Sequence, residues 1–363
     1  MYKIALELTK NCNLQCEYCY QTHLRENMDI KIAKNAIEIG VSNAISLRMD
    51  KVLISFFGGE PLLRFSEILE LTKYAQLLAA NKDLDLSFEI TTNGTLLRSD
   101  ILDFFADNQF YLKISLDGTP YYHDLNRLTS DGKGSYELIA RNFDSIISYQ
   151  KRLKMPVQIS MVITQNNYKD LFLNIKHLLT LGFRMFDTAL NSEDNWTISE
   201  LSELKKELGK VVDYYFERAK IGKGFAWTFI DNGIIPQMKK RKNYFCGAGV
   251  TSIFVNTAGE IFPCFACFQN EALIGSLDMG FFEEKLERFK KYKRNLNRQC
   301  TQCEINSYCA ACDCLMVNLE HSGDYYTVPM MFCELAKLRY ELTNKLFLNT
   351  EWNEILEKAK VRN

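Results

Sequence analysis

The chain has no excess of charge of one sign, no long hydrophobic run and no export signal at its start. Its 363 residues carry 44 Lys and Arg against 45 Asp and Glu, so the formal net charge of -1 favours neither a nucleic-acid surface nor a polybasic membrane surface. The opening residues MYKIALEL lack a charged segment followed by an apolar one. VLISFF, the longest apolar run of the first half, is far shorter than the ~18 residues that span a bilayer. We therefore expect a cytoplasmic protein with small-molecule or peptide partners, and neither nucleic acid nor membrane.

Cysteine is missing from most of the chain, which makes its placement informative. Three of the 12 cysteines lie between residues 12 and 19, none lies between Cys19 and Cys246, and nine lie from Cys246 to Cys333. Thiols in a reducing compartment are poor candidates for disulfides and better ones for metal ligands. The composition, 47% hydrophobic and 25% charged, is that of a globular protein, and the length favours about two domains.

The first cysteine group has the spacing C-x3-C-x2-C. Cys12, Cys16 and Cys19 follow an apolar segment directly, with Tyr18 just before the last cysteine. Three thiolates on one short loop can hold three irons of a 4Fe-4S cluster and leave the fourth iron open to a small molecule. A zinc loop or buried thiols are the alternatives, but zinc loops usually add a second cysteine pair further along the chain. The triplet therefore favours a cluster.

Between the two cysteine groups, short apolar segments alternate with longer amphipathic ones. The strand-like segments are residues 2–9, 51–57, 86–92, 111–117, 156–164 and 183–190. Helical periodicity fills the intervals, as in residues 30–45, 66–80 and 135–151. Six strand–helix units predict an α/β fold with a parallel sheet and helices outside it, two units short of a closed barrel. Such a barrel has an open flank that would admit part of a large substrate.

A glycine-rich segment, Gly58-Gly59-Glu60-Pro61, follows the second strand. Glycines at a strand end let the backbone approach a ligand closely, and Glu60 offers a carboxylate to an ammonium group. The alternative is a tight turn with Pro61 in the first position of a helix. Its place one strand after the cysteine loop favours the binding role.

A second polar segment, SLDGTPYYHDLNR, ends the fourth strand. Ser115 and Asp117 are two residues apart, so on a strand their side chains would share a face. A hydroxyl and a carboxylate on one face could recognise ribose hydroxyls by hydrogen bonds. Arg127 could clamp a carboxylate with two hydrogen bonds. The alternatives are a turn at Asp117 and a surface charge at Arg127. His123 is interpreted as a loop or core residue and not as a base.

The segments KNCNLQCEYCY, GGEP and SLDGTPYYHDLNR together resemble the radical S-adenosylmethionine (SAM) enzymes. The resemblance implies a partial (β/α)6 TIM-type barrel. It implies that the cluster on the first three cysteines binds SAM at its open iron and cleaves it to a 5'-deoxyadenosyl radical, which abstracts hydrogen. It also implies SAM contacts from Tyr18, Gly58, Gly59, Glu60, Asn93, Ser115, Arg127 and Leu190. Tyr18 and Leu190 would border the adenine with Asn93 nearby, although Leu190 could equally be a core leucine.

The second cysteine group resembles the SPASM extension of this family, which houses two auxiliary 4Fe-4S clusters. Its order is Cys246-x12-Gly259-x4-Cys264, then Cys267, Cys300-x2-Cys303-x5-Cys309, Cys312, Cys314 and Cys333. By the resemblance, one cluster would take Cys300, Cys303, Cys309 and Cys333.

The other auxiliary cluster would take Cys246, Cys264 and either Cys312 or Cys314, with Cys267 as a candidate fourth ligand. The family pattern expects a cysteine at position 313, where this chain has aspartate, so the spacing leaves both neighbours open. Nine cysteines for eight places leave one spare, or leave one cluster with an open iron. A zinc knuckle, for example Cys300 and Cys303 with Cys309 and Cys312, is the alternative for this region.

The organisation expected from these segments is a radical SAM barrel in residues 1–191, a helical bridge in 192–245, a SPASM domain in 246–340 and a C-terminal helix in 341–363. Because the chain begins at the first barrel strand, no N-terminal leader-binding domain is expected. A leader peptide would then be bound by the barrel rim, by the tail helices or by a separate protein.

The function expected from the resemblance is maturation of a ribosomally made peptide by a thioether or carbon–carbon cross-link. Sulfatase maturases place an aspartate, their proposed base, directly after the cysteine that matches Cys264, and this chain has Phe265 there. That difference counts against formylglycine formation. An electron donor such as a flavodoxin or ferredoxin is implied. The alternatives are a maturase of a formylglycine-type or quinone-type cofactor, a radical SAM enzyme acting on a nucleotide or small metabolite, and a non-catalytic zinc or iron-sulfur binding module.

Overall fold

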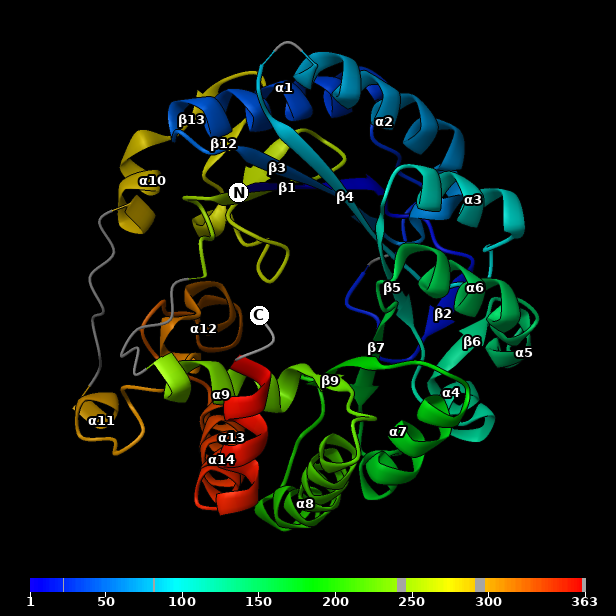
Figure 1. Cartoon of the computed structure of the whole chain (residues 1–363). Helices are drawn as coiled ribbons and strands as arrows, with labels where there is room; N and C mark the ends of the chain where they lie inside the picture. Colours follow the sequence, from blue (N-terminus) through cyan, green and yellow to red (C-terminus); the bar gives the residue numbers. More distant parts are fainter. Residues whose placement is uncertain (22, 81, 240–245, 291–297, 361–363) are drawn as a thin grey trace.

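The computed structural model describes residues 1–21, 23–80, 82–239, 246–290 and 298–360. Its centre is a mixed sheet of 11 strands in the order β13-β12-β11-β10-β1-β3-β4-β5-β7-β8-β9, drawn in Figure 1. The strands from β10 to β9 in this order pair in parallel. Six of them match the predicted barrel strands: β1 (Tyr2–Thr9), β3 (Lys51–Gly58), β4 (Asp85–Thr92), β5 (Tyr111–Ser115), β7 (Gln158–Ile163) and β8 (Met185–Leu190). The predicted α/β fold with six parallel barrel strands is confirmed.

The parallel strands are apolar over most of their length because the sheet is covered. β1 is buried at seven of its eight positions, and the main core contains apolar side chains from all six strands. A sheet buried on both faces produces near-continuous hydrophobic strands, as the sequence has here. β5 is shorter than predicted and ends at Ser115, so Asp117 lies beyond the strand.

Helices follow the strands and cover the outer side of the sheet (Figure 1). They are α1 (Ile30–Ser46), α2 (Phe65–Ala79), α3 (Ser99–Asp107), α6 (Phe143–Leu153) and α7 (Leu171–Thr180). The helix predicted over 135–151 is split into α5 (Tyr136–Ala140) and α6, because the chain tightens at Asn142, whose N–H bonds Ile139 O at 2.9 Å. The short pieces between β5 and α5 are α4 (Pro120–Asn126) and β6 (Arg127–Thr129).

The segment after β8 contains both helices and a strand. α8 (Ile198–Lys220) begins with a capping box, in which Thr197 and Glu200 each accept a backbone hydrogen bond from the other residue. The two-residue strand β9 (Ala226–Trp227) pairs with β8 in parallel, and α9 (Thr228–Lys239) follows. Residues 240–245 of the predicted bridge lie outside the described residues.

The cysteine-rich segment continues the sheet of the barrel. β10 (Ser252–Val255) pairs in parallel with β1, in register from Lys3↔Ser252 to Leu6↔Val255. Antiparallel strands then extend this edge: β11 (Glu260–Phe262), β12 (Gly275–Ser276) and β13 (Gly280–Phe281).

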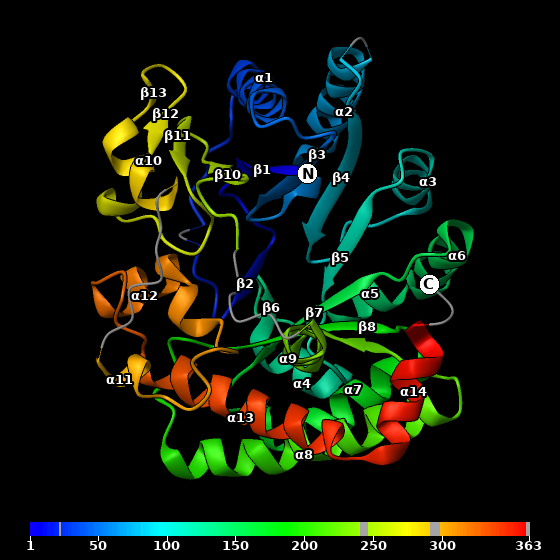
Figure 2. The same cartoon turned by 60° about the vertical axis from the view of Figure 1, so that its left-hand side comes forward.

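Five more helices follow in the described residues, and α13 and α14 among them pack against α8. They are α10 (Glu283–Lys290), α11 (Arg298–Thr301), α12 (Leu315–Ser322), α13 (Met330–Phe347) and α14 (Thr350–Lys360). Figure 2 shows α8, α13 and α14 side by side. The boundary predicted between residues 340 and 341 lies within α13, and residues 361–363 of the predicted C-terminal helix lie outside the described part of the chain. Within that part, we find no helix with the length and hydrophobicity to cross a membrane.

Candidate functional site

The first cysteine group lies on a loop at the carboxyl end of β1. The short strand β2 (Leu14–Cys16) fixes this loop by antiparallel pairing with β6, and the pairing puts Cys16 opposite Arg127. The N–H of Cys19 donates to the carbonyl of Cys16 at 3.0 Å, so a tight turn carries the last two cysteines. The structure thus brings Arg127 to the cysteine loop, although more than a hundred residues separate them.

The glycine-rich segment touches the same loop through its backbone. The N–H groups of Gly59 and Glu60 donate to the carbonyls of Thr9 and Asn11 at 2.8 and 2.9 Å. A Cβ atom at Gly58 would lie 2.2 Å from Thr9 O, and one at Gly59 would lie 2.3 Å from Asn11 O. Side chains are excluded at both positions because the chain itself approaches so closely.

The carboxylate of Glu60 is hydrogen-bonded to groups of the protein itself. It is fully buried and accepts hydrogen bonds from Leu62 N–H at 2.9 Å, Thr92 Oγ1 at 2.7 Å and Asn93 N–H at 2.7 Å. Burial raises the pKa of Glu60 to about 7, and the three donors oppose that shift. The side chain therefore ties the end of β3 to the end of β4.

Asn93 joins the end of β4 to the cysteine loop. Its Nδ2 donates to Asn13 Oδ1 at 2.9 Å and lies 3.8 Å from Cys12 Sγ, while its Oδ1 accepts from Thr95 Oγ1 at 2.7 Å. Asn13 in turn donates to Thr95 Oγ1 at 2.8 Å. Sequence reasoning missed Asn13 and Thr95, and their only signal was proximity to Cys12 and to the TTNG segment.

Asp117 and Arg127 form a buried ion pair beside the loop. Arg127 Nε and Nη2 donate to the two Asp117 oxygens at 2.9 and 3.2 Å. Tyr18 donates its hydroxyl to Asp117 and places its ring 5.2 Å from the guanidinium carbon. The Val162 N–H adds a further bond to Asp117 at 3.0 Å. The predicted bidentate geometry of Arg127 is thus directed at a carboxylate of the chain itself.

His123 is a core residue next to this ion pair, as the sequence analysis interpreted it. It is fully buried, and burial lowers its pKa to about 3, so the ring is neutral. Nδ1 accepts from the Asp117 N–H at 3.3 Å, which leaves Nε2 protonated and able to donate to Ser135 Oγ at 3.0 Å. Ser135 then donates to the carbonyl of Arg127 at 2.7 Å.

The other predicted SAM contacts lie at the same edge of the sheet. Ser115 is the last residue of β5 and is paired with Ser160 of β7. Leu190 is the last residue of β8 and is only 8% exposed. Carboxyl ends of parallel barrel strands form the functional face of such folds.

The three loop thiols lie close enough to influence one another electrostatically. Burial raises the pKa of Cys12 to about 12, and the Leu14 N–H, 3.4 Å from the sulfur, opposes the shift. Burial also raises the pKa values of Cys16 and Cys19, while the charge of Arg127 lowers both. His23 Nε2 lies 3.1 Å from Cys19 Sγ, a contact that the sequence analysis did not anticipate.

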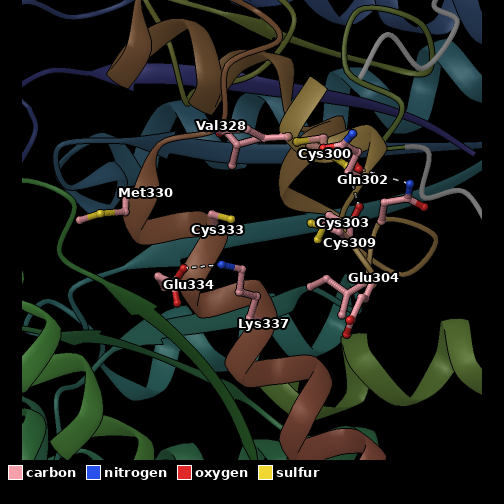
Figure 3. A pocket seen from close by; sticks show the side chains of 14 residues that line it. Cys300, Gln302, Cys303, Glu304, Cys309, Val328, Met330, Cys333, Glu334 and Lys337 are labelled. Carbon is pink, nitrogen blue, oxygen red and sulfur yellow. Dashed lines mark hydrogen bonds and ion pairs between the residues drawn. The ribbon is translucent and has the colours of Figure 1, made fainter. Parts of the chain in front are cut away.

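Five tail cysteines line one cavity of about 750 Å³. It is lined by Cys300, Cys303, Cys309, Cys333 and also Cys312. In Figure 3 the sulfur of Cys333, on α13, points toward Cys303 and Cys309 across the cavity, with Lys337 and Glu334 below. The set proposed for one auxiliary cluster is therefore gathered in one place.

A second tail group is formed by Cys246, Cys264 and Cys314. The charges of Cys314, Cys246 and Cys267 act on Cys264, and that of Cys246 acts on Cys314. No three His, Cys, Asp or Glu side chains among the described residues are arranged to hold a single metal ion. A 4Fe-4S cluster spaces its thiolates more widely, because each thiolate binds a different iron.

Comparison with known proteins places this geometry in a family. The Radical SAM superfamily model matches residues 6–176. A cysteine-type anaerobic sulfatase-maturating enzyme of Clostridium novyi (strain NT) is 26% identical over 355 residues, 92% of either chain. The solved structure of native anSMEcpe with bound AdoMet and Cp18Cys peptide has a TM-score of 0.80 at 18% identity, covering 97% of this chain and 99% of that one.

Streptococcus suis SuiB bound to the precursor peptide SuiA has a TM-score of 0.61 at 20% identity, covering 92% of this chain and 75% of that one. At these identities the two solved structures establish a shared fold. The matched domain begins within β1 and contains the cysteine loop, the glycine-rich segment and Arg127. Residues 6–176 thus match the Radical SAM superfamily, and nearly the whole chain is similar to a sulfatase-maturating enzyme.

Proposed function

We propose that this radical SAM enzyme is a peptide maturase that installs a thioether or carbon–carbon cross-link in a ribosomally made peptide. The observation that carries the proposal is the division of the cysteines into one group at the strand ends and two groups in the tail, joined through one sheet. Among the relatives, a sulfatase-maturating enzyme and SuiB with its precursor peptide point to polypeptide substrates.

The residues of the first loop fit a 4Fe-4S cluster with a vacant iron. Three thiols converge there, and the Leu14 N–H and the Arg127 side chain are positioned to stabilise thiolates. The side-chain amide of Asn126, next to Arg127, is buried, and its Nδ2 has no hydrogen-bond partner among the described residues. A buried donor of this kind suits a site that is completed by a bound group.

When bound, the cluster and SAM supply a 5'-deoxyadenosyl radical that takes hydrogen from the substrate. The chain's own residues hold the site rigid: Glu60 joins β3 to β4, Asn93 fixes the cysteine loop, and Asp117 fixes Arg127. Ser115 and Leu190 would contact SAM at the strand ends, and Tyr18 would stand beside it. Rigid placement of reactive groups is the main contribution a protein makes to such chemistry.

Phe265 separates this proposal from formylglycine formation. Its side chain is 48% exposed and its ring lies 5.0 Å from that of Phe57, at the end of β3. An apolar ring there cannot accept a proton. A cross-link needs an oriented peptide at this position, and an exposed aromatic surface suits peptide contact.

An electron donor such as a flavodoxin or ferredoxin would reduce the clusters. A leader peptide would be bound at the barrel rim, by α13 and α14, or by a separate protein. Three clusters give about 12 irons per chain, whereas the alternative of a zinc knuckle with one cluster gives about four.

The test is co-expression with a short peptide encoded beside the gene, followed by mass spectrometry of that peptide. We expect loss of two hydrogens, together with SAM-dependent release of 5'-deoxyadenosine by the reduced protein. The control is Cys16→Ala, which should abolish both. An unchanged mass in light water together with deuterium incorporation in heavy water would indicate epimerisation instead. Absence of SAM cleavage by the reconstituted enzyme would refute the catalytic proposal.

A further inference from the structure

We infer that Lys3 and Lys113, held together by Glu89, form an anion-binding site on the inner face of the barrel sheet, and that a carboxylate of the peptide substrate occupies it. The three residues belong to β1, β5 and β4 and are called the charged triad below. The identity of the occupant rests on the proposed function, whereas the anion site itself rests on contacts within this chain.

The charged triad lies on the face of the sheet that the helices leave uncovered. Successive side chains of a strand point to opposite faces. The residues on either side of the triad are at most 2% exposed and belong to the main core: Tyr2, Ile4, Phe88, Ile90, Leu112 and Ile114. Helices cover that core face in Figure 1, so the three charged side chains point to the inner one.

One carboxylate serves both lysines of the triad. Glu89 Oε1 accepts hydrogen bonds from Lys3 Nζ at 2.7 Å and from Ser55 Oγ at 2.8 Å, and its Oε2 lies 3.0 Å from Lys113 Nζ. Lys3 reaches Glu89 across β3, which lies between β1 and β4. Although burial raises the pKa of Glu89, the charges of Lys113 and Lys3 lower it to about 2, so the carboxylate is ionised at neutral pH.

The triad carries an unbalanced positive charge, because two ammonium groups share one carboxylate. Among the described residues we find no second acidic partner for either lysine. An ammonium group has three donor hydrogens, so each lysine can still donate to a ligand. The side chains of Lys3 and Lys113 are 34% and 26% exposed, and that of Glu89 is 10% exposed. The carboxylate is thus enclosed while the lysine side chains remain accessible.

The inner face around the triad is accessible to solvent. A closed barrel fills its interior with layers of bulky apolar side chains. Along β5 and β7, by contrast, buried positions alternate with partly or fully exposed ones. The partly exposed inner positions include Lys113, Ser115, Gln158 and Ser160. A polar part of a substrate can therefore enter the barrel beside the triad.

The position of Lys113 relates this site to the reaction. Lys113 lies two residues before Ser115 on the same face of β5, about 7 Å along the strand. Ser115 is a proposed SAM contact, so an anion held by Lys113 would anchor the substrate below the place of hydrogen abstraction. On β8, Asp187 accepts a hydrogen bond from Thr228 Oγ1, and its negative charge directs an anion toward the lysines. Asp and Glu side chains and the chain terminus are the carboxylates that a peptide offers.

The first test uses propionate, the carboxylate end of a glutamate side chain, as the probe. Thermal unfolding of the anaerobically reconstituted full chain is measured with increasing propionate, or with neutral propionamide, at constant ionic strength. A ligand of the native state raises the unfolding temperature, so propionate should raise it and propionamide should not. Lys113→Met removes one positive charge and should abolish the rise, whereas Lys113→Arg keeps the charge and should preserve it.

Glu89→Gln distinguishes an anion site from a purely structural group of charges. The variant loses the carboxylate that both lysines contact, so its unfolding temperature without ligand should fall. Its positive charge is no longer offset, so the rise caused by propionate should exceed that of the wild type. The matched control is Lys133→Met, which removes a lysine from an exposed pair with Asp131 and should respond like the wild type.

Three outcomes of the propionate test would overturn the anion site. They are no rise in the wild type, a rise with propionamide as large as that with propionate, and an equal rise in Lys113→Met. A smaller rise in Glu89→Gln than in the wild type would show that the triad serves only to join the strands.

The second test identifies the carboxylate of the peptide. Binding of the fluorescently labelled peptide encoded beside the gene is measured with enzyme that is kept oxidised and without SAM, so that no reaction occurs. Forms with one Asp or Glu changed to its amide, or with an amidated terminus, are compared. Neutralising the bound carboxylate should weaken binding about 10-fold or more. The same change should have no further effect in the Lys113→Met background.

The two proposals fail in different ways. If propionate acts through Lys113 but the peptide does not bind, the proposed function has the wrong substrate and the anion site stands. If the peptide binds and none of its carboxylates is coupled to Lys113, the inferred occupant is wrong and the proposed function stands.

Discussion

A single methyl group at position 59 would collide with the backbone that carries the first cysteine. Gly59→Ala places a carbon 2.3 Å from Asn11 O and 2.7 Å from Asn11 C, so the loop must move. We expect the variant to fold but to lose at least half of the SAM-cleaving activity of the wild type, because a displacement of about 1 Å at a reactive site has large effects on rate. The measurement is 5'-deoxyadenosine release together with iron content.

Gly209→Ala is the matched control for this prediction. Gly209 lies in α8, where an added Cβ would meet no atom within 4 Å. Alanine in a helix interior is about 0.8–1 kcal/mol more favourable than glycine, so this variant should be slightly more stable and fully active. Equal activity in the two variants would mean that the contact between the glycine segment and the loop is not important.

At the scale of elements, the ion pair between Asp117 and Arg127 connects the two-stranded β2–β6 sheet to the strands β5 and β7. Asp117→Asn removes the charge that compensates a buried guanidinium and turns amide hydrogens toward existing donors. We expect a loss of about 3–5 kcal/mol in the free energy of unfolding, measured by urea denaturation under anaerobic conditions, with loss of SAM binding.

The control is Asp131→Asn, two residues after β6. Asp131 pairs with Lys133 on the surface, with 58% of its side chain exposed, and an exposed pair of this kind contributes little. Its variant should unfold like the wild type. A similar small effect for Asp117→Asn would show that the β2–β6 sheet is held by its backbone pairing alone.

The elements show why part of the structure could be predicted from the sequence. The six barrel strands were predicted because their apolar runs are continuous. The cysteine groups were predicted because the metal-binding chemistry of cysteine follows from the residue type alone. β2, β6 and β9 were missed because each has two or three residues and forms only by pairing with distant segments. Asn13 and Thr95 were missed for the same reason: their hydrogen bond joins residues 82 positions apart.

The choice between Cys312 and Cys314 could not be made from spacing. The structure gives the two residues different surroundings: Cys312 lines the cavity of Cys300, Cys303, Cys309 and Cys333, whereas the charge of Cys246 acts on Cys314. The internal hydrogen bonds of Glu60 could not be predicted from the sequence either. A carboxylate next to two glycines suggests a side chain that is exposed to a ligand. The structure shows that Glu60 is buried between the ends of β3 and β4 and hydrogen-bonded there.

At the scale of the whole molecule, the barrel depends on the tail. A chain that ends at residue 239 would leave β1 without β10 and expose a parallel strand edge, a surface that promotes association. It would also uncover the face of α8 that α13 and α14 pack against. We expect this truncated chain to associate or precipitate, as measured by size-exclusion chromatography over a concentration series. A stable monomer with cooperative unfolding would contradict the prediction.

The shared sheet would also set the spacing between the proposed redox centres. The cysteine loop of Cys12, Cys16 and Cys19 leaves the end of β1, and Cys264 follows β11, which is two strands away through β10. Sliding β10 along β1 by one residue would break the whole register from Lys3↔Ser252 to Leu6↔Val255. Backbone hydrogen bonds thus fix the separation of the two loops more firmly than a flexible linker would. Because electron tunnelling rates fall steeply with distance, a fixed separation would keep the transfer rate constant from one turnover to the next.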